Sequence, residues 1–243
     1  MKNSLKFLTT AGLLLLGSLT AYNMALRAEY VHGTYRNPFR NYTALGLRNF
    51  DRVTVPAAGV LNVKIVAGPF GVHVEKDAAE FVHVVQHGEQ LIVVLAYPKE
   101  WKYLGRQEAV VISCPRLAAF TTEGTYIVAG RPQLDQLHGG GNALVQGFRQ
   151  DSLLLQQDRS SVIELKGNTL GWLRASAGTR PGSEPHLDIA ADNHIQAADL
   201  TIGHRGHLDL ATAIPRLRQQ FSDSATVTFS GAAVRGLGTR GGE

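Results

Sequence analysis

The carboxyl-terminal half of the chain repeats itself, and this repeat constrains the fold more than any other feature. The segment His186–Ala190 (HLDIA) returns 21 residues later as His207–Ala211 (HLDLA). Weaker copies stand on either side, Ser161–Gly167 before and Ala225–Gly231 after. A short alternating strand that recurs about every 20 residues is typical of a β-solenoid, in which each coil stacks on the next. The sequence therefore predicts an all-β, β-helix-like fold.

Alternation within the repeat predicts which side chains form the core. Stacked coils place equivalent residues in columns whose rungs are about 4.8 Å apart. We expect two buried columns, one of Ile163, Leu187, Leu208 and Val227, the other of Leu165, Ile189, Leu210 and Phe229. Gly130, Gly147 and Gly167 each close a strand, which suggests that the strands before them are equivalent. The loop Thr179–Pro185 is predicted to be an insertion in one coil.

The residues between 50 and 100 show period-two alternation, which indicates short, half-buried strands. Phe81–Gln86 and Gln90–Ala96 flank a predicted hairpin turn with Gly88 at a positive φ. We interpret this hairpin-rich segment as a β cap at one end of the stack, because open strand edges need protection. At the other end, Arg235 and Arg240 with the neighbouring glycines would protect the edge. A short helical turn is predicted for Lys99–Gln107.

The amino terminus predicts a hydrophobic anchor helix. Lys2 and Lys6 precede an uncharged stretch, residues 7–26, which is closed by Arg27. Twenty uncharged residues in a helix just span a bilayer of about 30 Å. Possible cleavage after Ala21, Ala25 or Ala28 would place a poorly suited residue at the third-last position, so we favour an uncleaved signal anchor over a removed signal peptide. The lysines favour a cytoplasmic start, which would place the rest of the chain on the exported side.

These features divide the chain into four predicted parts. Residues 1–27 form the signal anchor or signal peptide, and residues 28–47 an irregular tether. Residues 48–235 form the β domain and residues 236–243 a tail. Charged residues make up only 18% of the chain, and its basic residues are scattered, which argues against binding to nucleic acid. The single cysteine, Cys114, excludes an intrachain disulfide and any multi-cysteine metal site.

Three segments carry a resemblance to a known family. They are Phe50–Val53 leading into Val63–Val74, then His87–Val93, and Val110–Leu117 ending at Glu123-Gly124. Over about residues 50–232 the chain resembles the "putative auto-transporter adhesin head GIN-domain" family, bacterial domains of unknown function. The resemblance implies an exported all-β protein with a solenoid portion, and it transfers no catalytic residues. The chain departs from many exported relatives in lacking a lipid-bearing cysteine near its start.

The outward positions of the repeat supply the candidate binding residues. If Leu187 and Ile189 point inward, a carboxylate ladder forms on the solvent face, with two histidines beside it: Glu164, Asp188 and Asp209, flanked by His186 and His207. Carboxylates about 5 Å apart repel one another, and such a group can bind a divalent ion or a sugar. Their spacing also suits a retaining glycosidase. The alternative is an ordinary solvated sheet face.

Two other features have structural alternatives. The aromatic group Tyr97, Trp101 and Tyr103 could stack on a sugar or could cover the core. Cys114 is expected to be a buried structural thiol, since no basic partner is near it in the sequence.

We therefore predict an exported, membrane-tethered, non-catalytic binding or structural module of the bacterial cell envelope. Its expected partners are envelope proteins or glycans, with membrane contact through residues 7–26 and no cofactor. The domain would lie in the periplasm, anchored in the inner membrane, or would be secreted if the signal is removed. The alternative is a carbohydrate-active enzyme of the parallel β-helix type, which needs several acidic or basic groups converging in one groove.

Overall fold

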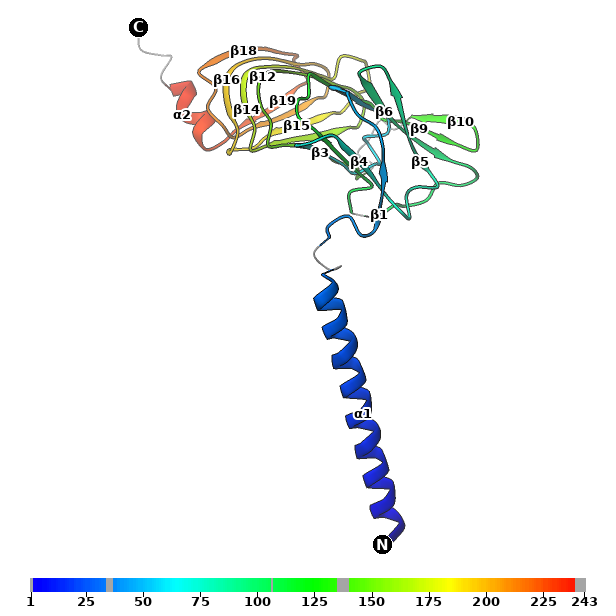
Figure 1. Cartoon of the computed structure of the whole chain (residues 1–243). Coiled ribbons are helices and arrows are strands. Elements are labelled where there is room, and N and C mark those ends of the chain that lie inside the picture. Colours follow the sequence, from blue (N-terminus) through cyan, green and yellow to red (C-terminus); the bar gives the residue numbers. More distant parts are fainter. Residues whose placement is uncertain (1, 34–36, 106, 135–139, 239–243) are drawn as a thin grey trace. The chain divides into compact units, whose positions relative to one another are not determined.

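The computed structural model describes residues 2–33, 37–105, 107–134 and 140–238 (Figure 1). The chain forms two compact units, Met1–Tyr42 and Thr43–Glu243. The first unit is dominated by helix α1 (Lys2–His32), whose run Leu13–Leu16 has a high helix propensity. The helix ends where Gly33, at a φ of 66°, donates its backbone N–H to the Glu29 carbonyl oxygen at 3.0 Å.

Helix α1 confirms the expected apolar helix but changes its limits. The stretch Lys6–Val31 is long and apolar enough to cross a membrane. The expected boundary at residue 27 falls inside the helix, which continues to His32. The segment predicted as an irregular tether, residues 28–47, also contains strand β1 (Tyr42–Leu45). These residues show no clear sequence period, so the last helical turn and the short strand were not predicted.

The unit Thr43–Glu243 is built of two open sheets, A and B, that face each other. In spatial order, sheet A contains β1, β4 (Gly71–Glu75), β7 (Val110–Cys114), β3 (Val63–Ala67), β11 (Ala143–Gln146), β13 (Val162–Lys166), β15 (His186–Ile189), β17 (His207–Leu210) and β19 (Thr226–Phe229). Sheet B contains β10 (Arg131–Leu134), β9 (Thr125–Val128), β6 (Gln90–Tyr97), β2 (Arg52–Val55), β8 (Ala119–Thr122), β12 (Arg149–Gln157), β14 (Thr169–Ala177), β16 (His194–Ile202) and β18 (Arg216–Phe221). Strand β5 (Val82–His87) pairs with β6, and a short helix, α2 (Ala232–Gly238), follows β19.

From β11 onward the chain passes alternately between the two sheets. In this part, successive strands of the same sheet pair in parallel, for example β13 with β15 in sheet A and β14 with β16 in sheet B. The register in sheet A joins His186 to His207 and Leu187 to Leu208. The alignment inferred from the sequence repeat is therefore confirmed, as is the mostly β architecture.

Both expected core columns are confirmed by the register, and by burial for every rung but the last. Ile163, Leu187 and Leu208 are register partners on successive strands, and each is buried, as are the members of the second column from Leu165 to Leu210. The last rung, Val227 and Phe229 on β19, is only half-buried because no further strand covers it. Gly147 and Gly167 close their strands at positive φ, at 80° and 61°. Burying one apolar face of every strand is what holds the stack together.

The predicted β cap is wrong for two of its strands. β2 lies between β6 and β8, and β3 lies between β7 and β11, so both belong to the interior of the parallel sheets. The predicted equivalence of Ile127–Gly130 with Leu144–Gly147 is also wrong, because β9 lies in sheet B and β11 lies next to β3. Alternation predicts that a segment is a strand, but it carries no information on which strand pairs with it. The β5–β6 hairpin with Gly88 at a φ of 60° is confirmed.

Two further local predictions differ from the structure. The described residues of Lys99–Gln107 contain no helix. At the carboxyl end, α2 takes the place of the expected glycine and arginine edge, and its Ala233 is buried against the core. Arg240 lies outside the described residues. The short helix contributes an apolar contact beside the last strand, where charge alone was expected to protect the edge.

Candidate functional site

The predicted ladder lies on the outer face of sheet A. Glu164, Asp188 and Asp209 are register partners on β13, β15 and β17, and His186 and His207 are partners beside them. The three carboxylates and His186 are partly exposed, and His207 is exposed. The structure thus brings the five predicted residues together, because they occupy the outward positions of strands whose leucines point inward.

The ladder contains a specific contact between neighbouring strands. The Nε2 atom of His186 lies 2.8 Å from Oδ2 of Asp209, and the rings of His186 and His207 are 5.9 Å apart. Burial raises the pKa of Asp188 above its ordinary value of 3.8, and the carboxylates of Glu164 and Asp209 raise it further, while His186 opposes them. Among the described residues, no three His, Cys, Asp or Glu side chains are grouped so that they could hold a metal ion. A binding role for the ladder stays a prediction.

The raised pKa of Asp188 predicts a pH-dependent effect of removing its charge. A carboxylate whose pKa is higher in the folded state destabilises that state once it ionises, so the cost is present at neutral pH and disappears as the pH falls below 3.8. Asp188→Asn is therefore expected to be slightly more stable than the parent at neutral pH, by less than about 1 kcal/mol because the group is partly exposed. Melting temperatures at neutral pH and below 3.8 measure this difference, which should vanish in acid. Asp192→Asn, in the exposed turn before β16, is the control, and a loss of stability in Asp188→Asn at neutral pH would contradict the interpretation.

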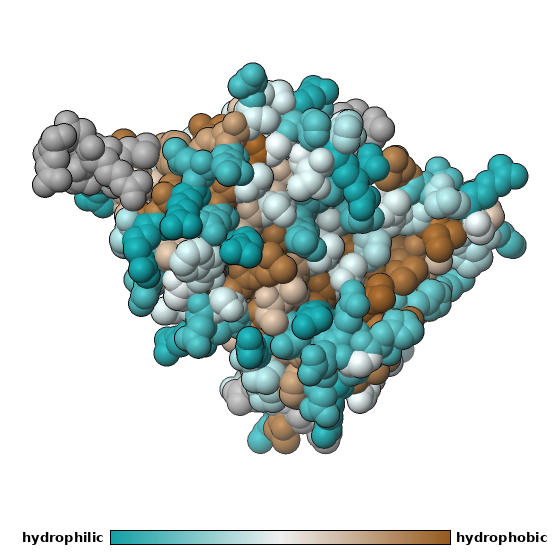
Figure 2. Space-filling view, turned by 90° about the horizontal axis from the view of Figure 1, so that it is seen from above, coloured by the Kyte–Doolittle hydropathy of each residue, from teal (hydrophilic) through white to brown (hydrophobic). Residues whose placement is uncertain are grey.

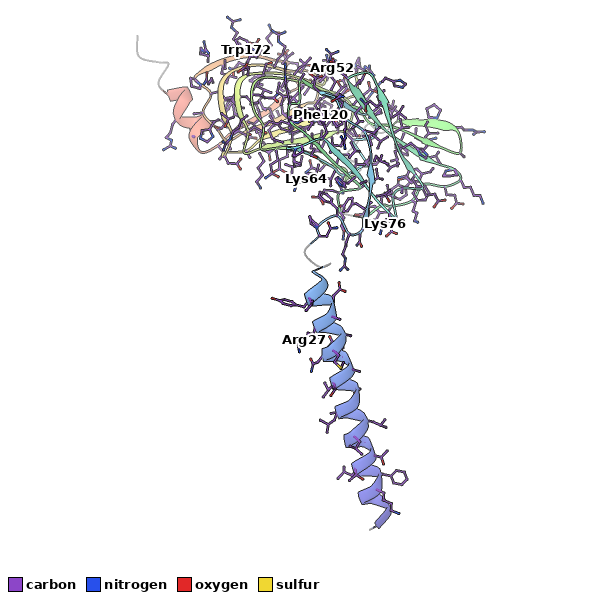
Figure 3. All side chains as sticks on the ribbon, viewed as in Figure 1. Arg27, Arg52, Lys64, Lys76, Phe120 and Trp172 are labelled. Carbon is purple, nitrogen blue, oxygen red and sulfur yellow. The ribbon has the colours of Figure 1, made fainter. Side chains whose placement is uncertain are left out.

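A groove follows the outer face of sheet B. It consists of three adjoining hollows of about 270, 500 and 210 Å³. The first and second hollows share the lining residues Asp199 and Arg218. The second and third share Gln156 and Ser176. Together they follow β14 from Trp172 to its end at Ala177 and reach Thr179 in the loop beyond, a span of about 20 Å at ~3.3 Å per residue. Figure 2 views the domain from this side, on which Figure 3 labels Trp172, and shows hydrophilic and hydrophobic residues interspersed.

Side-chain size explains why this face is hollow. Ser176 and Thr201 are register partners on the central strands β14 and β16, and the longer Gln156 and Gln220 flank them on β12 and β18. Short side chains in the middle and long ones at the margins leave a depression between them. The small Ala197 likewise lies between two larger register partners and is buried, although it points outward with Asp199.

Two rows of side chains give the groove its chemistry. In the first row, Trp172, Ala197 and Arg216 are register partners; in the second, Arg174, Asp199 and Arg218. The two rows therefore combine an indole, three guanidinium groups and one carboxylate, beside the amide and hydroxyl groups of the same face. None of these residues was selected from the sequence, although the alternation of Gly171–Ala177 places Trp172 and Arg174 on one face of a strand.

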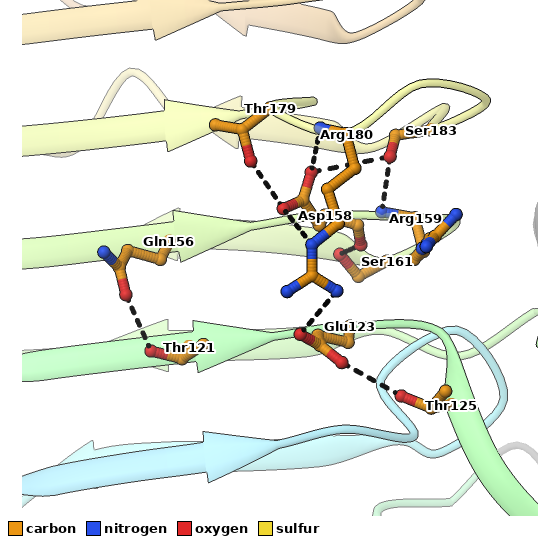
Figure 4. A network of polar contacts seen from close by, with 10 residues as sticks. All are labelled: Thr121, Glu123, Thr125, Gln156, Asp158, Arg159, Ser161, Thr179, Arg180 and Ser183. Atoms are coloured by element: carbon orange, nitrogen blue, oxygen red, sulfur yellow. Dashed lines mark hydrogen bonds and ion pairs between the residues drawn. The ribbon is translucent and has the colours of Figure 1, made fainter.

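A polar network closes one end of the groove (Figure 4). Asp158, in the turn after β12, accepts hydrogen bonds from the Thr179 hydroxyl at 2.6 Å and from the Arg180 backbone N–H at 3.1 Å. The Arg180 guanidinium lies 3.7 Å from Asp158 and 3.2 Å from Glu123. The predicted insertion Thr179–Pro185 is thus a loop whose start is fastened to sheet B.

The other candidates from the sequence separate in the structure. Tyr97 is buried and donates its hydroxyl to the Lys102 carbonyl oxygen at 2.8 Å, whereas Trp101 and Tyr103 are exposed with their rings 6.4 Å apart. The three aromatic side chains therefore do not form one platform. Cys114 is buried as expected, and burial, assisted by Asp51, raises the pKa of its thiol to about 12, so the thiol remains protonated and unreactive at neutral pH.

The chain is thus a mostly β protein with two facing, largely parallel sheets and an amino-terminal apolar helix. No family model matches it, and no curated protein matches it. A solved "putative adhesin" from Bacteroides fragilis is similar in structure, with a TM-score of 0.52 and 11% identity over 79% of this chain and 93% of that one. A "putative adhesin" and a "putative lipid binding protein" from Parabacteroides distasonis also match, each over 79% of this chain and 94% of the other, with TM-scores of 0.44 and 0.35 and identities of 11% and 14%. At these identities, the Bacteroides structure supports the fold alone.

Proposed function

We propose that the protein is an exported, membrane-tethered and non-catalytic binding module of the bacterial cell envelope. In this proposal the groove of sheet B binds a glycan chain. The observation that carries the proposal is the groove itself, which is about 20 Å long and combines the Trp172 indole with arginine, amide and hydroxyl side chains.

Helix α1 supports the tether. Its large apolar side chains are exposed, including Leu13, Leu14 and Leu15 at 71%, 70% and 61%. Leaving such a surface in water is unfavourable, and a bilayer removes that cost. Lys2 and Lys6 favour a cytoplasmic amino terminus, so the β domain would lie in the periplasm. Removal of the helix as a signal would instead release the domain from the membrane.

The parallel register supports a β-solenoid of the GIN-domain type. Each pair of strands from β11–β12 to β17–β18 adds one rung to sheet A and one to sheet B. The structural likeness to a "putative adhesin" fits an adhesin-type domain of this kind. In such a stack the outward side chains form rows that a long, extended ligand can follow.

The groove's side chains suit a sugar chain better than a small apolar molecule. An aromatic ring such as Trp172 can stack on the apolar face of a sugar, and the amides of Gln156 and Gln220 can exchange hydrogen bonds with hydroxyl groups. Its carboxylates, Asp199, Asp158 and Glu123, each lie within 4 Å of an arginine. Each of these carboxylates is therefore already engaged by a guanidinium group of the protein itself. Binding without catalysis is therefore the function that we propose.

The proposal predicts that Trp172 contributes to glycan binding. Trp172→Ala is expected to weaken binding of envelope polysaccharide by about tenfold, because a large stacking surface is lost. The chain has two tryptophans, so Trp101→Phe leaves Trp172 as the only indole, and its fluorescence in that variant should change as polysaccharide is added. Titration of the full-length protein in detergent measures both effects.

Trp101 provides the matched control. It is exposed and lies on the loop after β6, outside the groove, so Trp101→Ala should bind as the parent does. Equal losses in the two alanine variants would place binding elsewhere. Binding of an envelope protein with no binding of any polysaccharide would overturn the glycan proposal.

A further inference from the structure

The two rows of the groove carry more positive charge than their one carboxylate, Asp199, neutralises. Arg174 and Arg218 flank Asp199 in register on β14, β16 and β18, and Arg216 lies next to Arg218 on the same face of β18. Two guanidinium groups therefore face one carboxylate, with a third nearby. No ion pair within the described residues involves Arg216 or Arg218. The groove has hydrogen-bond donors left over for a ligand.

The contact between Arg174 and Asp199 is loose. Its closest nitrogen and oxygen atoms are 3.7 Å apart, which is beyond a good charge-assisted hydrogen bond. The Oδ1 atom of Asp199 is buried and has no hydrogen-bond partner. A buried carboxylate oxygen needs a compensating cation. Asp199 therefore favours guanidinium groups beside the groove but leaves their N–H donors available to a ligand.

We infer that the groove selects a glycan that carries anionic groups. The inference rests on the proposed function and specifies the ligand class of the same site. Carboxylate or phosphate groups on successive sugars would accept hydrogen bonds from Arg174, Arg216 and Arg218, whose planar guanidinium groups match such anions. Trp172, in the row of Arg216, would stack on a sugar ring beside the anionic group.

Protection of a sheet edge explains only part of this charge. β18 is the last strand of sheet B, and charged side chains on an edge strand hinder pairing with other molecules. This accounts for Arg216 and Arg218. Arg174 lies on β14, two strands inside the sheet, where there is no edge to protect. Its position on the groove, opposite the same aspartate as Arg218, points to a ligand.

The test uses the full-length protein in discs of neutral phosphatidylcholine, with polygalacturonate as the anionic probe and dextran as the neutral one. We expect polygalacturonate to bind at least about tenfold more tightly than dextran and to weaken as salt increases. Arg174→Gln and Arg218→Gln should each weaken polygalacturonate binding about tenfold. The control is Arg131→Gln, on β10 at the opposite end of sheet B, which changes the net charge equally and should bind normally.

Each other outcome overturns a different statement. Equal binding of dextran and polygalacturonate would overturn the anionic preference while leaving glycan binding intact, whereas binding of neither would overturn both. Equal losses in Arg131→Gln would reduce the effect to net charge. If glycerol 3-phosphate displaces the polysaccharide at the same concentration of anionic groups, the site recognises a phosphate headgroup and not a sugar chain. If Arg218→Gln binds normally but self-associates, Arg218 only protects the edge.

Discussion

Replacement of Leu187 by alanine is expected to lower the free energy of unfolding by about 2–5 kcal/mol. Leu187 is 1% exposed and lies between Ile163 and Leu208 in a continuous core column, so truncation opens a cavity that its neighbours on both strands line. The loss combines the transfer free energy of the removed methyl groups with the cost of that cavity. Denaturant unfolding followed by circular dichroism measures it.

The adjacent residue supplies the control. Asp188 points to the opposite face of the same strand, so Asp188→Ala should cost little or even stabilise the domain by removing a like charge beside Glu164 and Asp209. The two substitutions are at neighbouring positions, but one removes a buried side chain and the other a side chain on the solvent face. If Asp188→Ala unfolded the domain while Leu187→Ala did not, the inward and outward assignment would be shifted by one residue.

The success of this assignment from sequence has a simple physical origin. In sheet A the repeat length between β15 and β17 is constant along both strands, so His186 to Ile189 align with His207 to Leu210 without gaps. A period-two pattern then fixes the face of every residue once one leucine is placed inside. The candidate ladder from Glu164 to Asp209 followed from that geometry, which uses only local information.

The groove could not be predicted from the sequence, because its residues come from strands whose pairing is not encoded in any local pattern. In sheet B the register partner of Trp172 is Ala197, 25 residues later, and that of Ala197 is Arg216, 19 residues later, because the loop Thr179–Pro185 lengthens one coil. A fixed period therefore does not bring these residues together. The interior position of β2 and β3 was not predicted for a related reason. Each of these two strands pairs on both sides with strands that come later in the chain. Pairing between strands far apart in the chain produces no periodic pattern in the sequence.

A buried column of turn residues was missed in the same way. Phe148, Asn168, Asn193 and Thr212 occupy equivalent positions, each preceding a strand of sheet B or its loop. The Asn168 side chain accepts a hydrogen bond from the Phe148 backbone N–H and donates to the Val145 carbonyl oxygen, both at 3.0 Å. Thr212 donates its hydroxyl to the Asn193 carbonyl oxygen at 2.7 Å. The column satisfies backbone groups at turns where the sheets supply no partner.

Replacement of Asn193 by alanine is expected to lower the free energy of unfolding by roughly 1–3 kcal/mol, since the buried Asn168 backbone N–H loses its acceptor. The Asn193 amide donates to the carbonyl oxygens of Leu165 at 2.7 Å and Ala190 at 2.8 Å, and its Oδ1 accepts from the Asn168 backbone N–H at 3.0 Å. The Asn193 Oδ1 atom also accepts from Asn168 Nδ2 at 3.0 Å, so alanine removes four hydrogen bonds of a side chain that is 2% exposed. The carbonyl oxygens of Leu165 and Ala190 keep the backbone N–H groups of Ala190 and Asn193 as donors, which limits the loss. Chemical denaturation of the variant beside the parent measures the loss.

Gln196 on β16 separates this effect from the loss of any carboxamide. It carries the same amide chemistry only three residues away but is exposed, so Gln196→Ala should change stability by less than about 0.5 kcal/mol. Asn193→Asp refines the test further, because it keeps the acceptor for Asn168 but lacks the N–H donors to Leu165 and Ala190. It should therefore be destabilised as well, and more so at neutral pH, where a buried carboxylate would face two carbonyl oxygens. A variant Asn193→Asp as stable as the parent would show that these two hydrogen bonds contribute little, and the column would then act through packing alone.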